Sequence, residues 1–560
     1  MATITIDGRQ IEVEGRPTIM QVALANGILI PQFCWHPRLS IAGNCRICLV
    51  EVEKMPKLAI ACQTTVADGM AVKTTSGKVI NARQAVMEFL LINHPLDCPI
   101  CDEAGECKLQ DYAYQHSTGV SRFEFDKVRK PKRVELGPRV TLDTERCIMC
   151  SRCVRFCDEI VKKPQLVFTK RNDHVELTTF PGEQLDNPYS MNTIDLCPVG
   201  ALTSTDFRFR ARVWEMSSTP TICQGCSRGC NVHMWVRNNQ ILRLTPRLNP
   251  EVNDYWMCDH GRLETFKSVN AADRIQGPMV RKDGQLVEVG WDEAVASLVS
   301  ELKSFNGGEI AAIGSAYATN EDNFVFRKLM NHVGVENYCI LPHVDPGHAD
   351  EFLITPDKTP NGRGANLVAR QDGKPPVEYR TVIGKIAAGQ IKMLYVMEDD
   401  IGSVPGLEDV LHKLEILVVH ASNHNLTTRH ADIVLANSTY AEKNGTMVNI
   451  AGRVQRIRPA VATLYHERSL DGFSQSRWDR FGAHNDRWTR GQKYDVRESW
   501  RILAGLGNAM GLKWKYLTVQ DVFAEISLRI PEFKGLAYPA IDMAGAPLRS
   551  GVTTPVAAGA

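Results

Sequence analysis

The sequence has no excess of either charge, no secretory leader and no apolar run of membrane length. Lysine and arginine number 65 against 64 aspartate and glutamate residues, so no basic field indicates a nucleic-acid partner. The apolar run 414–419 is far shorter than the roughly eighteen residues of a membrane helix, and we expect membrane contact only through a partner. The chain opens on the alternating segment 3–6 instead of a basic and apolar leader, which predicts a reducing compartment.

Cysteine is scarce in the second half of the chain, and nucleotide-binding motifs are missing from the whole sequence. No G-x-G-x-x-G or phosphate-binding loop occurs, so no motif supports nucleotide binding. After Cys258 only Cys339 occurs, whereas sixteen of the 17 cysteines lie between Cys34 and Cys258. Thiols this dense in a reducing compartment favour metal ligation over disulfides. Zinc and iron–sulfur clusters are the two choices, and spacing distinguishes them.

The first set of cysteines has the spacing C-x10-C-x2-C-x13-C. Gly43 stands where a loop must turn tightly and direct backbone N–H groups at sulfur. A zinc ribbon favours two short C-x2-4-C pairs, and this set has only one. The plant-type [2Fe–2S] pattern has x4 in the first gap, so x10 is a departure that lengthens the first loop. We predict a [2Fe–2S] cluster held by Cys34, Cys45, Cys48 and Cys62.

The second set contains three cysteines and one histidine, in the pattern H-x3-C-x2-C-x5-C. Apolar spacing predicts a helix over 78–93, which Pro95 ends, so that His94 lies at the helix exit. Three thiolates leave a four-iron cluster one ligand short, and imidazole binds iron readily. A lone histidine is more often solvated or packed in a core, and His116 is a local competitor. We predict a [4Fe–4S] cluster held by His94, Cys98, Cys101 and Cys107.

The third set is Cys147-x2-Cys150-x2-Cys153-x3-Cys157, followed after a gap by Cys197-Pro198. In bacterial ferredoxins the fourth cysteine of such a run precedes proline and ligates another cluster. Here Asp158 follows Cys157, and 158–196 contains no cysteine that could complete a second cluster. We interpret Cys157 as a packed, unligated thiol that remains the rival of His94. We predict a [4Fe–4S] cluster held by Cys147, Cys150, Cys153 and Cys197.

The fourth set has the spacing C-x2-C-x3-C-x27-C and accompanies a segment of strand character over 232–244. Gly225 and Gly229 permit a close backbone approach to the sulfurs. Zinc is the alternative for four cysteines in two groups. We predict a third [4Fe–4S] cluster held by Cys223, Cys226, Cys230 and Cys258.

The rest of the chain predicts sheets and helices around these sets. Asp7-Gly8 suits a hairpin turn within a small sheet over 1–33, with a helix over 19–26. The basic, proline-containing stretch 120–140 is typical of a connector. Beyond Arg274, strands alternate with helices, which favours a parallel sheet covered on both faces. The expected strands are 309–314, 391–397 and 414–419, the expected helix is 320–333, and the tail after Tyr538 is expected to be mobile.

These four sets, in this order, resemble the large iron–sulfur subunit of respiratory complex I, the proton-pumping NADH:quinone oxidoreductase. The resemblance covers residues 1 to about 270 closely. Further segments resemble the molybdopterin-oxidoreductase-like domain of that family. The segments that carry the likeness are 34–40 (CWHPRLS), 43–48 (GNCRIC), 93–98 (NHPLDC), 195–202 (DLCPVGAL), 431–435 (ADIVL), 440–446 (YAEKNGT) and 452–455 (GRVQ).

The resemblance implies a multidomain protein of α/β and α+β class. It begins with a β-grasp ferredoxin-like domain and continues through a His/Cys cluster domain and a bacterial-ferredoxin-like cluster domain to a molybdopterin-oxidoreductase-like α/β domain. The expected domains are 1–77 ([2Fe–2S]), 78–119 ([4Fe–4S] with one histidine and three cysteine ligands), 120–215 ([4Fe–4S] ferredoxin-like), 216–273 (molybdopterin-oxidoreductase-type [4Fe–4S]), 274–465 (reduced α/β domain) and 466–560 (C-terminal extension with a mobile tail).

Two departures from the family weaken the case for a molybdenum cofactor. A subdomain between about Asp350 and Lys392 is reduced. His260 stands two positions after the last cluster cysteine, where molybdopterin enzymes commonly have lysine or arginine. The expected cofactors are therefore one [2Fe–2S] and three [4Fe–4S] clusters, the last of which only some bacterial members have.

By analogy with the family, the chain is expected to relay single electrons and to contain no catalytic residue. A flavin subunit that oxidises NADH delivers electrons to the [2Fe–2S] cluster, and they pass through the Cys147 and His94 sets to a two-cluster ferredoxin-like subunit near quinone. The expected location is the peripheral arm of a membrane complex, on the cytoplasmic face of the inner membrane, with other peripheral-arm subunits as partners. The chief alternative is a subunit of an NAD-linked molybdenum formate dehydrogenase, in which Cys339 would be the sole candidate metal ligand in the α/β part. An iron-only hydrogenase and a zinc scaffold are the remaining alternatives.

Overall fold

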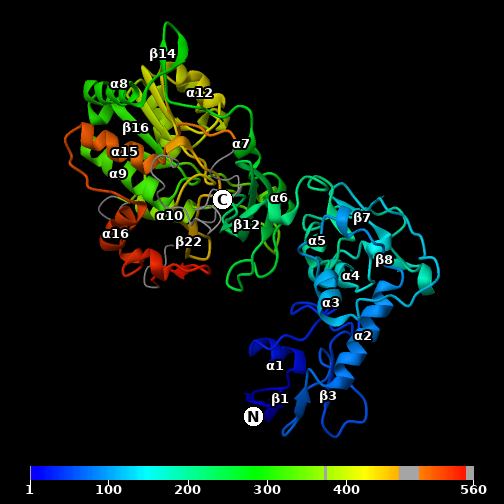
Figure 1. Ribbon diagram of the computed structural model, residues 1–560. Coiled ribbons are helices and arrows are strands. Elements are labelled where there is room, and N and C mark those ends of the chain that lie inside the picture. The colour runs from blue at the N-terminus through cyan, green and yellow to red at the C-terminus, as the bar shows by residue number, and fades with distance from the viewer. Residues whose placement is uncertain (1, 371–374, 466–490, 550–560) are drawn as a thin grey trace. The chain divides into compact units, whose positions relative to one another are not determined.

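The structure is a computed structural model that describes residues 2–370, 375–465 and 491–549 (Figure 1). The chain forms two compact units, Met1–Glu215 (unit 1) and Met216–Ala560 (unit 2). Parts of the expected C-terminal extension, 466–490 and the tail from 550, lie outside the described residues. Within the described residues, no helix has both the length and the apolar character needed to cross a bilayer.

Unit 1 begins with a five-stranded sheet in the order β2-β1-β5-β3-β4. The hairpin predicted at Asp7-Gly8 is confirmed, because both residues adopt positive φ and the flanking strands pair in antiparallel register. Helix α1 (Ile19–Ala25) agrees with the expected helix, and the capping box of Thr18 and Gln21 begins it. The strands are β1 (Ala2–Ile6), β2 (Arg9–Val13), β3 (Leu49–Val52), β4 (Ala59–Ile60) and β5 (Ala71–Lys73).

The remainder of unit 1 consists of short helices and two small sheets. Helix α2 (Gly77–Leu91) ends before Pro95, as predicted. The expectation that 120–140 is only a connector is wrong at its end, because residues 134–135 pair with β7 and complete a sheet with β10. The other elements are η1 (Cys98–Ile100), α3 (Lys108–His116), β6 (Val134–Glu135), β7 (Val140–Leu142), α4 (Arg152–Arg155), the π-turn η3 (Phe156–Ile160), β8 (Leu166–Thr169), β9 (Glu176–Thr179), α5 (Asn192–Leu196) and β10 (Leu202–Ser204).

Unit 2 opens with an antiparallel sheet of three strands, β11 (Ser217–Ile222), β12 (Asn231–Arg237) and β13 (Gln240–Pro246). The strand character predicted over 232–244 belongs to two strands instead of one. Asn238 and Asn239 adopt positive φ and reverse the chain between them, because asparagine tolerates the left-handed region. Helices α6 (Asp259–Leu263) and α7 (Lys267–Asn270) follow.

The α/β part of unit 2 is built on a seven-stranded sheet in the order β15-β14-β20-β19-β18-β16-β17. Five strands are parallel, as predicted, but β14 joins β20 in antiparallel register, so the sheet is mixed. The parallel strands are β16 (Ile310–Gly314), β17 (Asn337–Ile340), β18 (Met393–Met397), β19 (Ile416–Ala421) and β20 (Ile433–Ala436), and the antiparallel pair is β14 (Met279–Lys282) and β15 (Gln285–Glu288).

The predicted helix 320–333 is confirmed as α9 (Asn320–Val333). A second sheet pairs β21 (Gly445–Val448), β22 (Arg453–Ile457) and β23 (Ala546–Pro547). The other helices are α8 (Trp291–Ser304), α10 (Gly362–Val368), α11 (Tyr379–Ala387), α12 (Leu426–His430), α15 (Ser499–Ala509) and α16 (Val519–Arg529).

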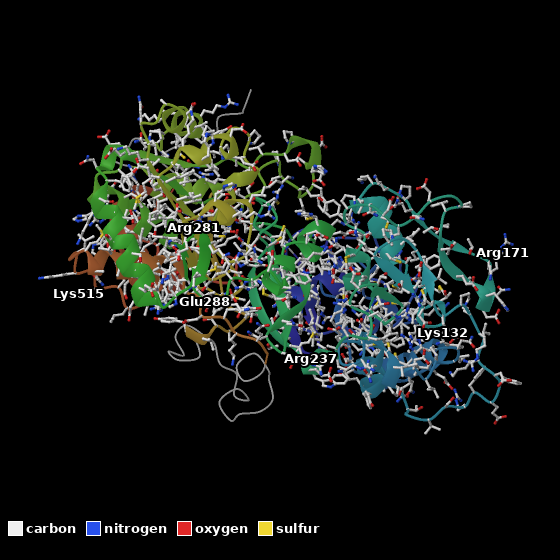
Figure 2. The ribbon with its side chains drawn as sticks, turned by 90° about the horizontal axis from the view of Figure 1, so that it is seen from above. Lys132, Arg171, Arg237, Arg281, Glu288 and Lys515 are labelled. Carbon is white, nitrogen blue, oxygen red and sulfur yellow. The ribbon has the colours of Figure 1, made fainter. Side chains whose placement is uncertain are left out.

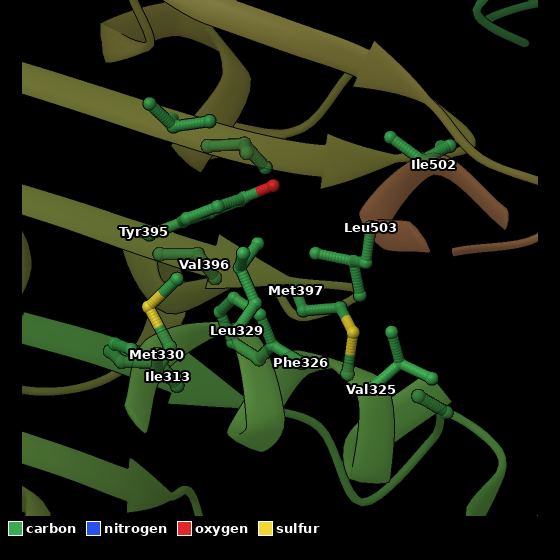
Figure 3. Close-up of a cluster of buried hydrophobic side chains, with 14 of the residues drawn as sticks. Ile313, Val325, Phe326, Leu329, Met330, Tyr395, Val396, Met397, Ile502 and Leu503 are labelled. Atoms are coloured by element: carbon green, nitrogen blue, oxygen red, sulfur yellow. The ribbon is translucent and has the colours of Figure 1, made fainter. Parts of the chain in front are cut away.

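The core of this domain lies between α9, α15 and strands β16 and β18 (Figure 3). Phe326 of α9 packs edge-on against Tyr395 of β18, with ring centroids 4.9 Å apart. Ile313 of β16 and Leu503 of α15 are fully buried in the same cluster. Each such side chain contributes roughly 1.5–3 kcal/mol on burial, which explains why continuous apolar runs predicted these strands correctly.

A buried ion network connects this core to the segment before β21. The Lys443 ammonium lies 2.9 Å from Asp322 Oδ2 and 2.6 Å from Glu398 Oε2, and its side chain is 1% exposed. Glu398 directly follows β18 and adopts positive φ, and its carboxylate also accepts a hydrogen bond from Ser499 of α15. Burial lowers the pKa of Lys443, but the charges of Asp322 and Glu398 outweigh it and raise that pKa overall. The lysine is therefore charged inside the domain.

Replacing Lys443 by methionine should destabilise unit 2 by about 3–5 kcal/mol, because two buried carboxylates lose their counter-ion. The matched control is Lys282→Met, whose ion pair with Glu293 is half exposed, and which should change stability by about 1 kcal/mol or less. Chemical denaturation followed by tryptophan fluorescence measures both variants. Equal midpoints for the two variants would contradict the role given to Lys443.

A histidine–carboxylate pair lies beyond the carboxyl end of β18. His343 Nε2 is 3.0 Å from Asp399 Oδ2, and the ring of Tyr317 lies 5.2 Å from the imidazole. Burial lowers the pKa of His343, but the hydrogen bond to Asp399 and the charges of Asp399 and Asp357 raise it above its ordinary value of 6.5. The protonated imidazole is thus favoured in the folded state.

The His343 pair should make stability depend on pH. A folded-state pKa above the unfolded value gives stabilisation that is complete below pH 6.5 and is lost as the pH rises through the raised pKa. Thermal unfolding of His343→Gln should therefore differ from the parent most at pH 6 and least at high pH. His348→Gln is the control, because its pair with Asp345 is largely exposed. A difference that grows with pH would refute this assignment.

Candidate metal centres

The four sulfurs of the first set lie together in the loop around Gly43. Cys34 is hydrogen-bonded through sulfur to Cys45 and Cys62, and Cys48 to Cys62. Backbone groups of Asn44 and Cys45 also hydrogen-bond to the Cys34 sulfur, as the sequence predicted for this loop. These contacts, led by those with Cys45 and Cys62, lower the pKa of Cys34 to about 2. The thiolate form that binds metal is therefore favoured at this position.

The third set surrounds a single cavity. Cys147, Cys150, Cys153 and Cys197 line it together with apolar residues that include Phe168, Leu177 and Val199. Burial raises the pKa of Cys147 to about 12 and those of Cys153 and Cys197 well above their ordinary value. A buried thiol of this kind releases its proton when a metal coordinates it. The cavity therefore suits a group that supplies positive charge to four sulfurs at once.

Cys157 is one turn beyond Cys153 but is not among the residues that line this cavity in the described part of the chain. It is fully buried in η3, and burial raises its pKa to about 12. Its position agrees with a packed thiol, and whether it ligates iron stays a prediction.

The second set is the most exposed of the four. Cys98 opens to solvent in η1, whereas Cys101 and Cys107 are buried. Burial, followed by the charges of Arg146 and Lys127, lowers the pKa of His94 to about 4, so its imidazole is neutral at physiological pH. A neutral imidazole is the form that binds metals. That His94 joins the three cysteines stays a prediction.

Asp97, between His94 and Cys98, ties this loop to the third set. It accepts hydrogen bonds from Arg146, the residue before Cys147, at 2.9 and 3.1 Å. Lys132 reaches the same carboxylate oxygen at 2.5 Å (Figure 2). The competitor His116 instead lies at the end of α3, where its ring is 5.7 Å from that of Tyr112.

The fourth set lies beside strands β11 and β12 and helix α6. The Cys223 amide donates to the Cys230 carbonyl at 2.8 Å. The amides of Gly225 and Gly261 donate to the Cys223 and Cys258 sulfurs at 3.4 and 3.3 Å. Such donors stabilise sulfur that carries negative charge. Burial raises the pKa of the Cys258 thiol to about 11 and that of Cys230 further.

Two glycines that sequence reasoning overlooked leave room for sulfur. A Cβ on Gly200 would lie 2.2 Å from the Cys101 sulfur, and one on Gly261 would lie 2.8 Å from the Cys223 sulfur. Glycine is needed where the backbone approaches an inorganic core this closely. The signal for Gly200 was its place directly after Cys197-Pro198, and Gly261 lies three residues after Cys258.

The donors of all four sets fit iron–sulfur clusters. They are buried or loop-held thiols with backbone N–H groups directed at sulfur, which is how proteins hold such clusters. Within the described ranges, no three or more His, Cys, Asp or Glu side chains converge as the ligands of a single metal ion. The sets are therefore characterised by contacts and electrostatic interactions among their sulfurs.

A chain with cysteine sets of this kind ahead of an α/β domain is an iron–sulfur oxidoreductase-type protein with a molybdopterin-oxidoreductase domain. Family models match it in this order: a 2Fe-2S iron-sulfur cluster binding domain (1–77), the NADH-ubiquinone oxidoreductase-G iron-sulfur binding region (83–122), the NADH-quinone oxidoreductase subunit 3 ferredoxin-like domain (137–203), the molybdopterin oxidoreductase Fe4S4 domain (216–265) and molybdopterin oxidoreductase (274–351 and 358–470).

Over its matched residues the chain belongs to the family of the G subunit of NADH-quinone oxidoreductase. It is 41% identical over 340 residues to the G subunit from Rickettsia felis, 61% of this chain and 50% of that one. It is 40% identical over 344 residues to the mitochondrial 78 kDa subunit of NADH-ubiquinone oxidoreductase of Neurospora crassa, 60% of this chain and 45% of that one. The chain thus spans about half the length of the curated relatives it matches.

A solved structure, NAD+-reducing [NiFe]-hydrogenase in the H2-reduced state, is 29% identical and covers 38% of this chain and 91% of its own. Its TM-score is 0.34.

Replacing Gly200 by alanine should cost the protein the metal of the His94 set, because the new Cβ would displace the Cys101 sulfur. We expect about four irons fewer per chain, the content of one [4Fe–4S] cluster. Iron and acid-labile sulfide analysis measures the loss. Gly77→Ala is the control, because nothing lies within 4 Å of the Cβ it would add. Full iron content in Gly200→Ala would contradict the placement of this set.

Proposed function

We propose that the chain is an electron-transfer subunit of an NADH:quinone oxidoreductase, complex I. The observation that carries the proposal is the gathering of the cysteine sets into buried groups whose sulfurs meet one another and backbone N–H donors. The family matches over the same segments support it. When bound, an iron–sulfur cluster supplies a one-electron carrier whose potential depends on ligand type, hydrogen bonds and burial.

The proposed ligand sets follow the cysteine spacing and the sulfur contacts. One [2Fe–2S] cluster and three [4Fe–4S] clusters are assigned, and the N-terminal sheet supports a β-grasp ferredoxin-like fold for 1–77. The sets are Cys34, Cys45, Cys48 and Cys62; His94, Cys98, Cys101 and Cys107; Cys147, Cys150, Cys153 and Cys197; and Cys223, Cys226, Cys230 and Cys258.

In the proposed relay the chain accepts single electrons at the Cys34 set and passes them through the Cys147 set to the His94 set. The residues of the chain hold the sites, exclude water and donate hydrogen bonds to sulfur, and no acid or base is required. The proposed partners are a flavin and NADH-binding subunit, a two-cluster ferredoxin-like subunit near quinone, and other peripheral-arm subunits. The proposed location is the cytoplasmic face of the inner membrane.

The formate dehydrogenase alternative is not favoured. The curated relatives described above are subunits of NADH-quinone and NADH-ubiquinone oxidoreductases. Cys339, its candidate metal ligand, is fully buried in the core on β17, where burial raises its pKa to about 12. We therefore propose no molybdenum chemistry for this chain.

Iron analysis and electron paramagnetic resonance of the anaerobically purified chain test the proposal. We expect about fourteen irons per chain, from one two-iron and three four-iron clusters. His94→Ala should abolish the resonance of one [4Fe–4S] cluster, whereas Cys157→Ala, the matched control, should leave every resonance intact. Stoichiometric zinc, or a colourless protein without labile sulfide, would contradict the proposed function. The reverse result for the two variants would make Cys157 the fourth ligand.

A further inference from the structure

Two buried arginines flank the cysteines of the third set. Arg146 immediately precedes Cys147, and Arg152 lies on α4 between Cys150 and Cys153. They are 3% and 4% exposed. A guanidinium keeps its charge even when buried, so each places a permanent positive charge within unit 1.

Arg152 joins the first set to the third. Its Nη2 donates to the carbonyl of Trp35, the residue after Cys34, at 2.5 Å. Its Nη1 donates to the carbonyl of Leu196, the residue before Cys197, at 3.2 Å. From the same helix, Arg155 donates to the carbonyls of Cys34 at 2.5 Å and Cys150 at 3.3 Å. The two guanidinium groups therefore hold the loops of both sets.

The charge of Arg152 faces sulfur instead of carboxylate. Both of its recorded acceptors are neutral carbonyls, and its Nε has no acceptor among the described residues. Burial lowers its pKa, and the charges of Cys150, Cys197 and Cys34 act in the opposite direction. An uncompensated buried cation is costly, so the anionic sulfur of two metal sites is the counter-charge that this environment offers.

Arg146 occupies the corresponding position between the third and second sets. It donates to Asp97 Oδ2 and lies 3.2 Å from Asp143 Oδ2. Burial lowers its pKa, but the charge of Cys101 in the second set, followed by Asp143 and Asp97, raises it overall. Its Nη1 also reaches the carbonyl of Gly200, whose Cα adjoins the Cys101 sulfur.

We propose that Arg152 and Arg146 are positioning residues for electron transfer, each holding two neighbouring cluster sites together and raising the reduction potentials of both by its positive charge. The inference rests on the proposed function. One electron leaves one site, which is oxidised, and arrives at the next, which is reduced, so each junction carries added negative charge whichever site holds the electron. A cation in the low-dielectric space between the sites stabilises that charge, and no proton has to move.

The test is a redox titration of the full-length, cluster-loaded chain followed by electron paramagnetic resonance. In Arg152→Gln the midpoint potentials of the [2Fe–2S] cluster and of the Cys147-set cluster should both fall, while that of the His94 set stays. In Arg146→Gln the Cys147-set and His94-set potentials should fall, while the [2Fe–2S] potential stays. Arg171→Gln is the control, because Arg171 points into solvent (Figure 2) and its loss should shift none of them.

Conservative variants separate charge from simple structural loosening. Arg152→Lys and Arg146→Lys keep the charge and lose the planar fork, so they should retain most of the parent potential. If a glutamine variant loses a cluster, the lysine variant provides the test, and a lysine variant with a lowered potential overturns the inference. Unchanged potentials in fully loaded glutamine variants also overturn it and leave the proposed function standing. A parent chain without cluster resonances refutes the proposed function itself.

Discussion

The cost of burying sulfur as an anion is the constraint on which unit 1 depends. Burial raises the pKa of the thiols around the third set, yet the thiolate is the form that binds metal. The chain meets this cost with backbone N–H donors at the sulfurs, with glycines such as Gly200 where a side chain would intrude, and with buried arginines. Loops that look irregular by secondary structure are therefore shaped by electrostatic needs, and the small sheets serve to hold them.

Unit 2 shows the same chemistry without sulfur. Lys443 is surrounded by Asp322 and Glu398 where β18 ends, and α15 contributes a further donor. Breaking such a network leaves a buried charge, so it specifies how the segment before β21 meets the sheet. The domain resembles molybdopterin oxidoreductases by family match, and in this chain the described residues at the end of β18 pair with one another.

The arginines of the third set give the relay an internal logic. Arg152 contacts the loop of the first set, and Arg146 contacts the loop of the second, so one short segment organises both of its neighbours. These contacts lie within one compact unit. Spacing and charge at the two junctions are thereby controlled by residues that never ligate metal.

The sequence by itself determined the local features of this protein. The cysteine spacings, the Asp7-Gly8 hairpin, α1, α2, α9 and the buried parallel strands were predictable, because each depends on residues close together in the chain. Tertiary structure decided the rest. It pairs 134–135 with β7, divides 231–246 into two strands at Asn238-Asn239, adds antiparallel β14 to the sheet and brings Arg152 to Trp35 across 117 positions. Such contacts depend on packing and buried charge between distant segments, and periodicity or spacing cannot encode that information.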